Sequence, residues 1–193
     1  MPKQQLIAYF DQFLALEEEE KKELLERTQE RSIKRRQFVL QEGDVCHHYN
    51  FVVEGCLKMY SIDEKGTEHN LQFAAENEWM TDLGSLFSEE PSKLYIEAVE
   101  PSLIVRIEKE DLKFFFVNYP KFDRNFRVIT ENKYVELQSR LLQNISSSAQ
   151  ERYLHFLAKY PHLSNRLPNT QIASYLGITP EFLSKIRKDL ARR

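Results

Sequence analysis

Two charged residues near the C-terminus, Glu181 and Lys185, have the types and the spacing of side chains that contact bases in the DNA major groove. They lie four positions apart, so on a helix they share one face. A glutamate can accept a hydrogen bond from the amino group of cytosine, and a lysine can donate to O6 and N7 of guanine. The pattern predicts direct contacts to base edges from a helix that begins near Thr179.

Further polar residues accompany this pair. Ser184 and Lys188 fall on the same stripe of the predicted helix, while Arg187, Lys188, Arg192 and Arg193 suit contacts with phosphate groups. Phosphate contacts add affinity but carry no sequence information. The predicted DNA-binding residues are Thr179, Glu181, Ser184, Lys185, Arg187 and Lys188.

Two predicted helices separated by a tight turn position this face, within residues 169–188 (NTQIASYLGITPEFLSKIRK). Gly177 ends the first helix, where a residue without Cβ most easily adopts a positive φ. Thr179 caps the second helix, and Pro180 suits its first position. Together these features predict a helix-turn-helix, and an ordinary helical hairpin within an oligomer is the alternative. The residues expected to be buried between the two helices are Ile172, Ala173, Leu176, Leu183 and Ile186.

The formal net charge of −3 is unevenly distributed along the chain. Residues 149–193 hold 8 Lys/Arg and 3 Asp/Glu, whereas the preceding residues hold 19 and 27. A basic C-terminal part attached to an acidic body is typical of a nucleic-acid-binding module. Basic segments also promote solubility or bind acidic partners, so the charge alone leaves the partner open.

The composition is that of a globular protein. A hydrophobic fraction of 41% is enough to build a core in 193 residues, and this length predicts one or two domains. The sequence has no run of 18 apolar residues and no signal-peptide pattern. The scarcity of cysteine, with only Cys46 and Cys56, fits a reducing compartment. We therefore expect a soluble, cytoplasmic protein that does not associate with membranes.

The pattern of apolar residues changes along the sequence before the basic segment. Residues 6–30 repeat apolar residues at three- and four-residue spacing, which predicts a helix. From Ser32 to Ile107, short segments rich in Val, Ile, Phe and Tyr alternate with turn signals such as Glu42-Gly43-Asp44. This alternation predicts an antiparallel barrel or jelly roll. The expected strands are residues 37–40, 49–53, 57–62, 68–73, 94–99 and 104–107.

Helices return after residue 108. We expect a short helix over 109–118 and a long helix over 122–145, followed by a hinge at 146–148 and a helix over 149–160. Packing of the long helix against a second copy of the chain is the simplest explanation of its apolar stripe. The alternative is that the stripe packs only on the barrel, and Lys133 and Arg140 interrupt it. The stripe consists of Phe122, Phe126, Ile129, Leu137, Leu141 and Ile145.

Other chemistries find less support in the sequence. Cys46-His47-His48 could be read as a metal or haem site, but adjacent residues on a strand point to alternate faces. A buried thiol beside exposed imidazoles is the preferred interpretation, so we expect no metal site. Phosphate-binding glycine loops, a Gly-x-Ser-x-Gly sequence and metal-ligand spacing of the five histidines are all absent, so we do not expect an enzyme. The remaining alternative is a small-ligand-binding or protein-interaction module that does not bind DNA specifically.

Taken in their order along the chain, these sequence features resemble those of the CRP/FNR family of bacterial transcription regulators. Besides 169–188, the resemblance rests on residues 42–44, 51–55 (FVVEG) and 82–87 (DLGSLF). It implies an α+β fold with an N-terminal jelly-roll β-roll like a cyclic-nucleotide-binding domain, a long dimerisation helix and a C-terminal winged-helix-like helix-turn-helix domain. The corresponding domains are 1–118, 119–146 and 147–193.

The resemblance also implies a function. The protein would be a homodimer that binds a two-fold symmetric site on double-stranded DNA, with RNA polymerase and a small-molecule effector as further partners. The β-roll would sense a signal or serve as a scaffold. The effector, the target genes and the choice between activation and repression stay open, as does any sensing role of Cys46 or His47.

Departures from the family pattern bear on the effector. Cyclic-nucleotide-binding members carry an Arg followed by Ser or Thr that holds the cyclic phosphate, whereas residues 89–95 (EEPSKLY) contain no Arg. This argues against cyclic AMP, since Lys93 lacks the bidentate fork of arginine. Iron–sulfur members need several cysteines near the N-terminus, and none precedes Cys46, so no cluster is expected. Lys185 stands where many relatives carry Arg, which implies a different or looser base preference. The residues that would line any ligand pocket are Asp82, Gly84, Ser85 and Lys93.

Overall fold

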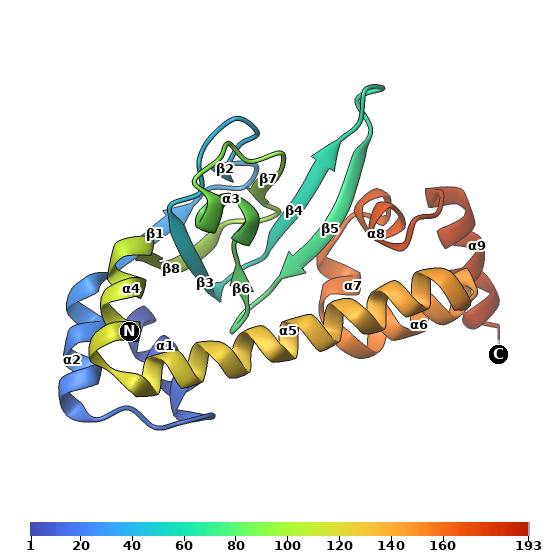
Figure 1. Cartoon of the computed structure of the whole chain (residues 1–193). Coiled ribbons are helices and arrows are strands. Elements are labelled where there is room, and N and C mark those ends of the chain that lie inside the picture. Colours follow the sequence, from blue (N-terminus) through green and yellow to red (C-terminus); the bar gives the residue numbers. More distant parts are fainter. Residues whose placement is uncertain (193) are drawn as a thin grey trace. The chain divides into compact units, whose positions relative to one another are not determined.

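The computed structural model describes residues 1–192 of the chain (Figure 1). These residues divide into two compact units. The first unit contains residues 1–61 and 72–131, and the second contains residues 62–71 and the described residues from 132 onward. The predicted domain boundaries at 118/119 and 146/147 separate segments with different expected roles and do not coincide with the two compact units. They stay a prediction.

Two antiparallel four-stranded sheets form the β-roll. The first sheet has the strand order β1-β8-β3-β6, and the second has the order β2-β7-β4-β5. The strand bounds of the first sheet are Thr28–Ile33 (β1), Ser102–Glu108 (β8), His48–Glu54 (β3) and Trp79–Met80 (β6). Those of the second are Phe38–Leu40 (β2), Tyr95–Ala98 (β7), Leu57–Ile62 (β4) and Glu68–Ala74 (β5). The predicted jelly-roll-like β-roll is therefore confirmed.

Alternation of side chains along β8 explains how the first sheet is buried. Val105 and Ile107 are buried on one face of β8, and Ile104 is buried on the other. Helix α1 (Pro2–Asp11) and helix α4 (Lys109–Asn118) both contact β8. Aromatic rings fill this part of the core, with Phe10 and Phe126 at 6.1 and 5.5 Å from Trp79 between ring centroids. Trp79 therefore has a structural role in the core.

The N-terminal region differs from the single helix that periodicity predicted over residues 6–30. Two helices, α1 and α2 (Glu18–Arg27), are separated by residues 12–17. The carboxylate of Asp11 accepts a hydrogen bond from the Leu16 N–H at 3.1 Å, and Glu17 and Glu20 form a capping box that begins α2. Residues 28–33 pair with β8 instead of continuing the helix. These local capping bonds and the long-range strand pairing override the apolar spacing.

The other predicted elements agree with the structure within a few residues. All six expected strands are present, and the structure adds β1, β6 and the short helix α3 (Leu83–Ser88). The long helix α5 spans Pro120–Ser146. Its apolar stripe divides, because Phe122, Phe126 and Ile129 are buried whereas Leu137, Leu141 and Ile145 are exposed.

Helices build most of the second unit. They are α6 (Ala149–Lys159), α7 (Leu163–Arg166), α8 (Asn169–Leu176) and α9 (Pro180–Leu190). The hydroxyl of Ser148 and the carboxylate of Glu151 form a capping box that begins α6 directly after the predicted hinge. Residues 149–192 contain no strand.

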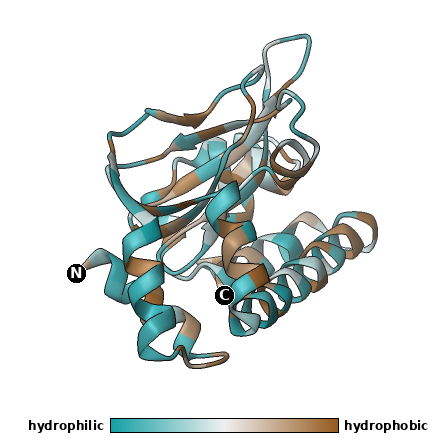
Figure 2. Ribbon diagram, turned by 60° about the vertical axis from the view of Figure 1, so that its left-hand side comes forward, coloured by the Kyte–Doolittle hydropathy of each residue, from teal (hydrophilic) through white to brown (hydrophobic). Residues whose placement is uncertain are grey.

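Hydrophobic and hydrophilic residues are interspersed along the helices and strands (Figure 2). Within the described residues, no helix is long and apolar enough to cross a membrane.

Candidate nucleic-acid interface

Gly177 makes the turn between α8 and α9. It has a φ of +66°, as the sequence predicted, and its N–H donates to Ser174 O at 3.2 Å. The next N–H, of Ile178, donates to Ala173 O at 3.0 Å. These bonds satisfy carbonyls that the end of α8 would otherwise leave without partners.

Helix α9 begins with the predicted cap. The Thr179 hydroxyl accepts a hydrogen bond from the Phe182 N–H at 3.2 Å, and Pro180 occupies the first helical position. Glu181 lies in the first turn, where the positive end of the helix dipole favours a carboxylate. All five residues predicted to lie between the two helices are buried. The local geometry of the helix-turn-helix is therefore confirmed.

Four of the predicted DNA-binding side chains share the face of α9 that points away from the buried residues. Glu181, Ser184, Lys185 and Lys188 are all exposed. They lie opposite Leu183 and Ile186, which pack toward α8. The Ser184 hydroxyl donates to Pro180 O at 2.9 Å, which leaves its oxygen able to accept a further bond. This face carries two ammonium groups, a carboxylate and a hydroxyl, all suited to hydrogen bonding with base edges and phosphates.

Arg187 does not share this face. Its side chain is half-buried, donates to Ser164 O at 3.2 Å and lies over the Tyr153 ring, 5.5 Å from the centroid. The structure thus turns this predicted phosphate contact toward α6 and α7, where it holds α9 in place. Arg192 is exposed, and Arg193 lies outside the described residues.

Phe182 is a candidate contact that sequence reasoning missed. It flanks the polar face of α9 in the first turn, and 46% of its surface is exposed. An aromatic side chain at this place can pack against the methyl group of thymine. The sequence could have shown this, because Phe182 does not share the helix face of the buried residues Leu183 and Ile186.

A second feature without a sequence signal is the tip of the β4–β5 hairpin, residues 62–71, which belongs to the same compact unit. The side chain of Asn70 donates to Gln171 O at 3.2 Å, and the hydroxyl of Ser174 donates to Glu68 O at 2.7 Å. A cavity of about 670 Å³ separates residues 67–70 from the turn and the start of α9. The hairpin tip therefore lies against α8 and near the turn that leads into α9.

Arg140 fastens the same hairpin tip. Its guanidinium donates to Leu71 O, to Asn70 O at 3.2 Å and to Tyr175 O at 3.1 Å, and it lies 3.9 Å from the centroid of the Tyr175 ring. Arg140 therefore donates hydrogen bonds to backbone carbonyls within the second unit, and its charge does not interrupt the apolar stripe.

Two of the four predicted ligand-pocket residues, Asp82 and Ser85, are hydrogen-bonded within the surrounding chain segment. The Asp82 carboxylate accepts bonds from the Ser85 N–H at 3.3 Å and the Ser92 hydroxyl at 2.6 Å. The Ser85 hydroxyl donates to Glu90 O at 2.6 Å and accepts from the Cys46 N–H at 2.9 Å. Gly84 and Lys93 are exposed.

These internal bonds bear on whether a cyclic nucleotide would fit. The Asp82 carboxylate and the Ser85 hydroxyl already stabilise the chain segment around α3, and residues 81–105 contain no arginine to hold a cyclic phosphate. The segment does not fit a cyclic nucleotide, and its assignment as a ligand pocket stays a prediction.

The Cys46-His47-His48 sequence places its side chains in different surroundings. Cys46 is buried, His47 is exposed and His48 is half-buried. Burial raises the pKa of the Cys46 thiol, so the protonated form is favoured. Within residues 1–192, no group of three or more His, Cys, Asp or Glu side chains is arranged to hold a metal ion.

Comparisons with known proteins show which proteins this chain resembles. Residues 30–119 match the cyclic nucleotide-binding domain family. A protein of Lacticaseibacillus casei named "Probable transcriptional regulator flp" is 28% identical over 163 residues, covering 79% of this chain and 72% of that protein. A CRP/FNR-family protein from Eubacterium rectale has the same fold, with a TM-score of 0.71 and 17% identity over 95% of this chain and 88% of that chain. The chain is similar to CRP/FNR-family regulators, and the matching family model spans slightly less than half of its length.

FixK2 from Bradyrhizobium japonicum extends the likeness. It matches this chain with a TM-score of 0.76 and 18% identity, covering 86% of this chain and 85% of FixK2. At this identity the match shows the fold alone. The resemblance to the CRP/FNR family that residues 42–44, 51–55, 82–87 and 169–188 predicted thus agrees with these matches.

Proposed function

We propose that this chain is a CRP/FNR-family, sequence-specific DNA-binding transcriptional regulator that acts as a homodimer on a two-fold symmetric site. The observation that carries the proposal is the exposed face of α9, which begins at a capped N-terminus and is backed by a packed helix-turn-helix. The regulator named above, a relative over most of the chain, supports the same role.

In this proposal, different side chains of α9 contact base edges and phosphates. Glu181 and Lys185 read base edges, because residues in the first turns of such a helix reach furthest into the major groove. Lys188 and Arg192 neutralise phosphates, and Thr179 fixes the start of the helix. Arg187 positions α9 through Ser164 and Tyr153.

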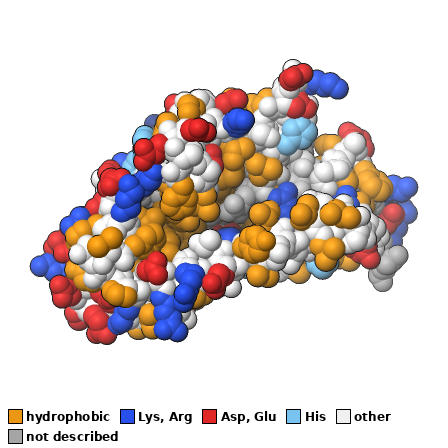
Figure 3. All heavy atoms as spheres, viewed as in Figure 1, with side chains coloured by type: hydrophobic (Ala, Val, Ile, Leu, Met, Phe, Trp, Pro, Cys, Tyr) orange, Lys and Arg blue, Asp and Glu red, His pale blue; other side chains and the backbone are white. Residues whose placement is uncertain are grey.

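The second half of α5 supplies the dimer interface in this proposal. Its apolar side chains are exposed by 59–77%, at spacings of three, four and seven residues that suit packing against another helix. Hydrophobic side chains gather along α5 on the molecular surface (Figure 3). A monomer would leave this large apolar patch in water. The residues concerned are Tyr134, Val135, Leu137, Leu141, Leu142 and Ile145.

Arg140 and Lys133 do not oppose this interface. Arg140 is directed to the hairpin tip, and Lys133 is paired with Glu136 at 3.2 Å between Nζ and Oε2. Both charges therefore have partners within their own chain.

Selection from random duplex DNA by the purified full-length protein tests the proposal. Enrichment of an inverted repeat is the expected result, because a two-fold dimer presents two copies of α9 to the DNA. Half-site centres should lie one helical turn, about 10 base pairs, or a multiple of it apart.

Two other outcomes would contradict parts of the proposal. Enrichment of a single half-site without symmetry would contradict the dimer and leave the DNA-reading role intact. Absence of enrichment, together with no salt-sensitive binding to any duplex, would favour the alternative of a ligand-binding or protein-interaction module.

A further inference from the structure

The strand register gathers polar side chains at one end of the first sheet. Arg31 on β1 lies opposite Ile104 on β8, and Arg106 is two residues further along β8 on the same face. Asn50 on β3 lies directly opposite Arg106. Because side chains on one face alternate along each strand, Arg31, Arg106 and Asn50 converge on one side of the sheet.

The two arginines have no negatively charged partner. The Arg31 side chain forms neither an ion pair nor a hydrogen bond with any residue in 1–192, and the Arg106 guanidinium donates only to the neutral amide oxygen of Gln29, at 2.7 and 3.2 Å. Burial, and secondly the charge of Arg106, lowers the pKa of Arg31. Two neighbouring half-buried cations without a counter-charge are unfavourable unless an anion joins them.

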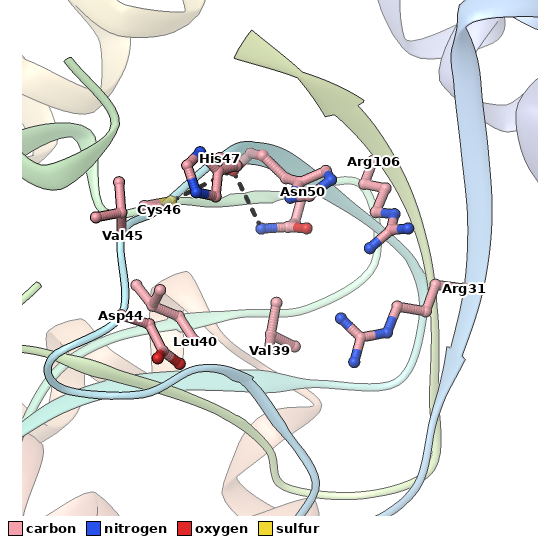
Figure 4. Close-up of a pocket in the computed structure, with 10 residues that line it drawn as sticks. Arg31, Val39, Leu40, Asp44, Val45, Cys46, His47, Asn50 and Arg106 are labelled. Carbon is pink, nitrogen blue, oxygen red and sulfur yellow. Dashed lines mark hydrogen bonds between the residues drawn. The ribbon is translucent and has the colours of Figure 1, made fainter. Parts of the chain in front are cut away.

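Both guanidinium groups face a cavity of about 340 Å³. Figure 4 shows them at one end of this cavity, both directed inward, with Leu40, Val45 and Asp44 toward the other end and Val39 between. The cavity is large enough for a small organic molecule and combines a cationic end with aliphatic walls.

Two carboxylates and one imidazole complete the charged surroundings. Asp44 is exposed and forms no ion pair with either arginine within the described chain. The buried Nε2 of His48 has no hydrogen-bond partner among residues 1–192, and it lies 3.7 Å from Glu108 Oε1. His48 also lines the cavity, so its Nε2 is a further polar atom that a ligand can meet.

We propose that this cavity binds a small organic anion whose carboxylate or phosphate group is held by Arg31 and Arg106 together. Guanidinium groups suit both oxyanions, because their planar forks donate two parallel hydrogen bonds. Val39, Leu40 and Val45 would contact the remaining, less polar part of the ligand. None of Asp82, Gly84, Ser85 and Lys93 lines this cavity, although the Cys46 N–H at its wall donates to the Ser85 hydroxyl. The proposal does not depend on DNA binding.

Calorimetric titration of the full-length protein tests the proposal, with inorganic phosphate and malonate as probes and sodium chloride replacing them at equal ionic strength. We expect saturable binding of at least one probe at one site per chain. The tighter probe distinguishes a phosphate ester from a carboxylic acid as the ligand class. Arg31→Gln and Arg106→Gln should each weaken binding at least tenfold.

Arg35→Gln is the matched control, because it removes one exposed positive charge from the same unit outside the cavity. Its affinity should stay within twofold of the wild type. Arg31→Gln should also keep or raise the thermal midpoint, since Arg31 has no partner to lose. Saturation by neither probe, an equal loss in Arg35→Gln, or unfolding of Arg31→Gln would each overturn the proposal.

Discussion

The backbone N–H of Asn70 donates a hydrogen bond to the hydroxyl of Ser174 at 3.0 Å, across 104 residues of sequence. The same hydroxyl donates to Glu68 O, so one side chain on α8 satisfies two backbone groups of the hairpin tip. Asn70 is buried, and a buried N–H without a partner is costly. Ser174 therefore helps to keep the hairpin tip on the helix-turn-helix, together with Arg140 and the Asn70 side chain.

Ser174→Ala is expected to release the hairpin tip locally. The unsatisfied groups cost about 1–3 kcal/mol, which corresponds to roughly 5- to 150-fold faster amide exchange in residues 62–71. Hydrogen exchange followed by mass spectrometry measures this directly. Ser184→Ala is the control, because it makes the same change at an exposed position of a neighbouring helix. Equal exchange rates in both variants would show that the Ser174 bonds contribute nothing.

Gly177→Ala is expected to lower stability through the backbone alone. A Cβ at this position would meet no atom within 4 Å, but the φ of +66° costs an L-residue about 1–2 kcal/mol. The thermal midpoint of unfolding checks this. Gly84→Ala makes the same replacement in α3 without a positive φ, and its loss should be smaller. A variant as stable as the wild type would contradict the turn geometry.

Negative charges on the exposed face of α5 are expected to separate the proposed dimer. Leu137 and Leu141 are exposed by 61% and 60%, so Leu137→Glu and Leu141→Glu can be introduced without disturbing the core. Both should sediment as monomers at concentrations where the wild type is a dimer, because a glutamate would be buried without a partner. Asn132→Glu adds the same charge elsewhere on α5 and should leave the dimer intact. Unchanged association of the Leu variants would place the interface elsewhere.

Asp63 in the β4–β5 turn is expected to titrate well below an ordinary aspartate. The hydrogen bond from His69, at 3.0 Å, and the N–H groups of Thr67 and Lys65 lower its pKa to about 2. Because the folded-state pKa is depressed, the stabilisation is present above about pH 4 and is lost as the pH falls toward 2. Carbon-13 NMR of the carboxyl group reports the midpoint. His69→Ala should raise it, and a wild-type midpoint near 4 would contradict these bonds.

The sequence was most informative where structure is set by local rules. Gly177, Thr179 and Pro180 determine the turn and the start of α9 through backbone conformation and capping, which depend on residues a few positions apart. The apolar spacing of α5 likewise predicted a long helix. The exposed face of α9 followed from the burial of Leu183 and Ile186.

Long-range pairing accounts for what the sequence did not show. Residues 28–30 have helical spacing but pair with β8, far along the chain. Arg140 looked like an interruption of an apolar stripe because its acceptors, Asn70 and Leu71, are about 70 residues away. The convergence of Arg31 and Arg106 depends on strand register, which periodicity does not specify.

The base-reading role of α9 is tested most directly by measuring the affinity of wild type, Lys185→Ala and Lys188→Ala for the selected site and for each single base-pair change in it. For the wild type, a changed base pair should cost about 1–3 kcal/mol at contacted positions. Lys185→Ala should lose this discrimination at one position of each half-site, whereas Lys188→Ala should weaken binding evenly across all sequences. Unaltered discrimination at every position in Lys185→Ala would contradict the account.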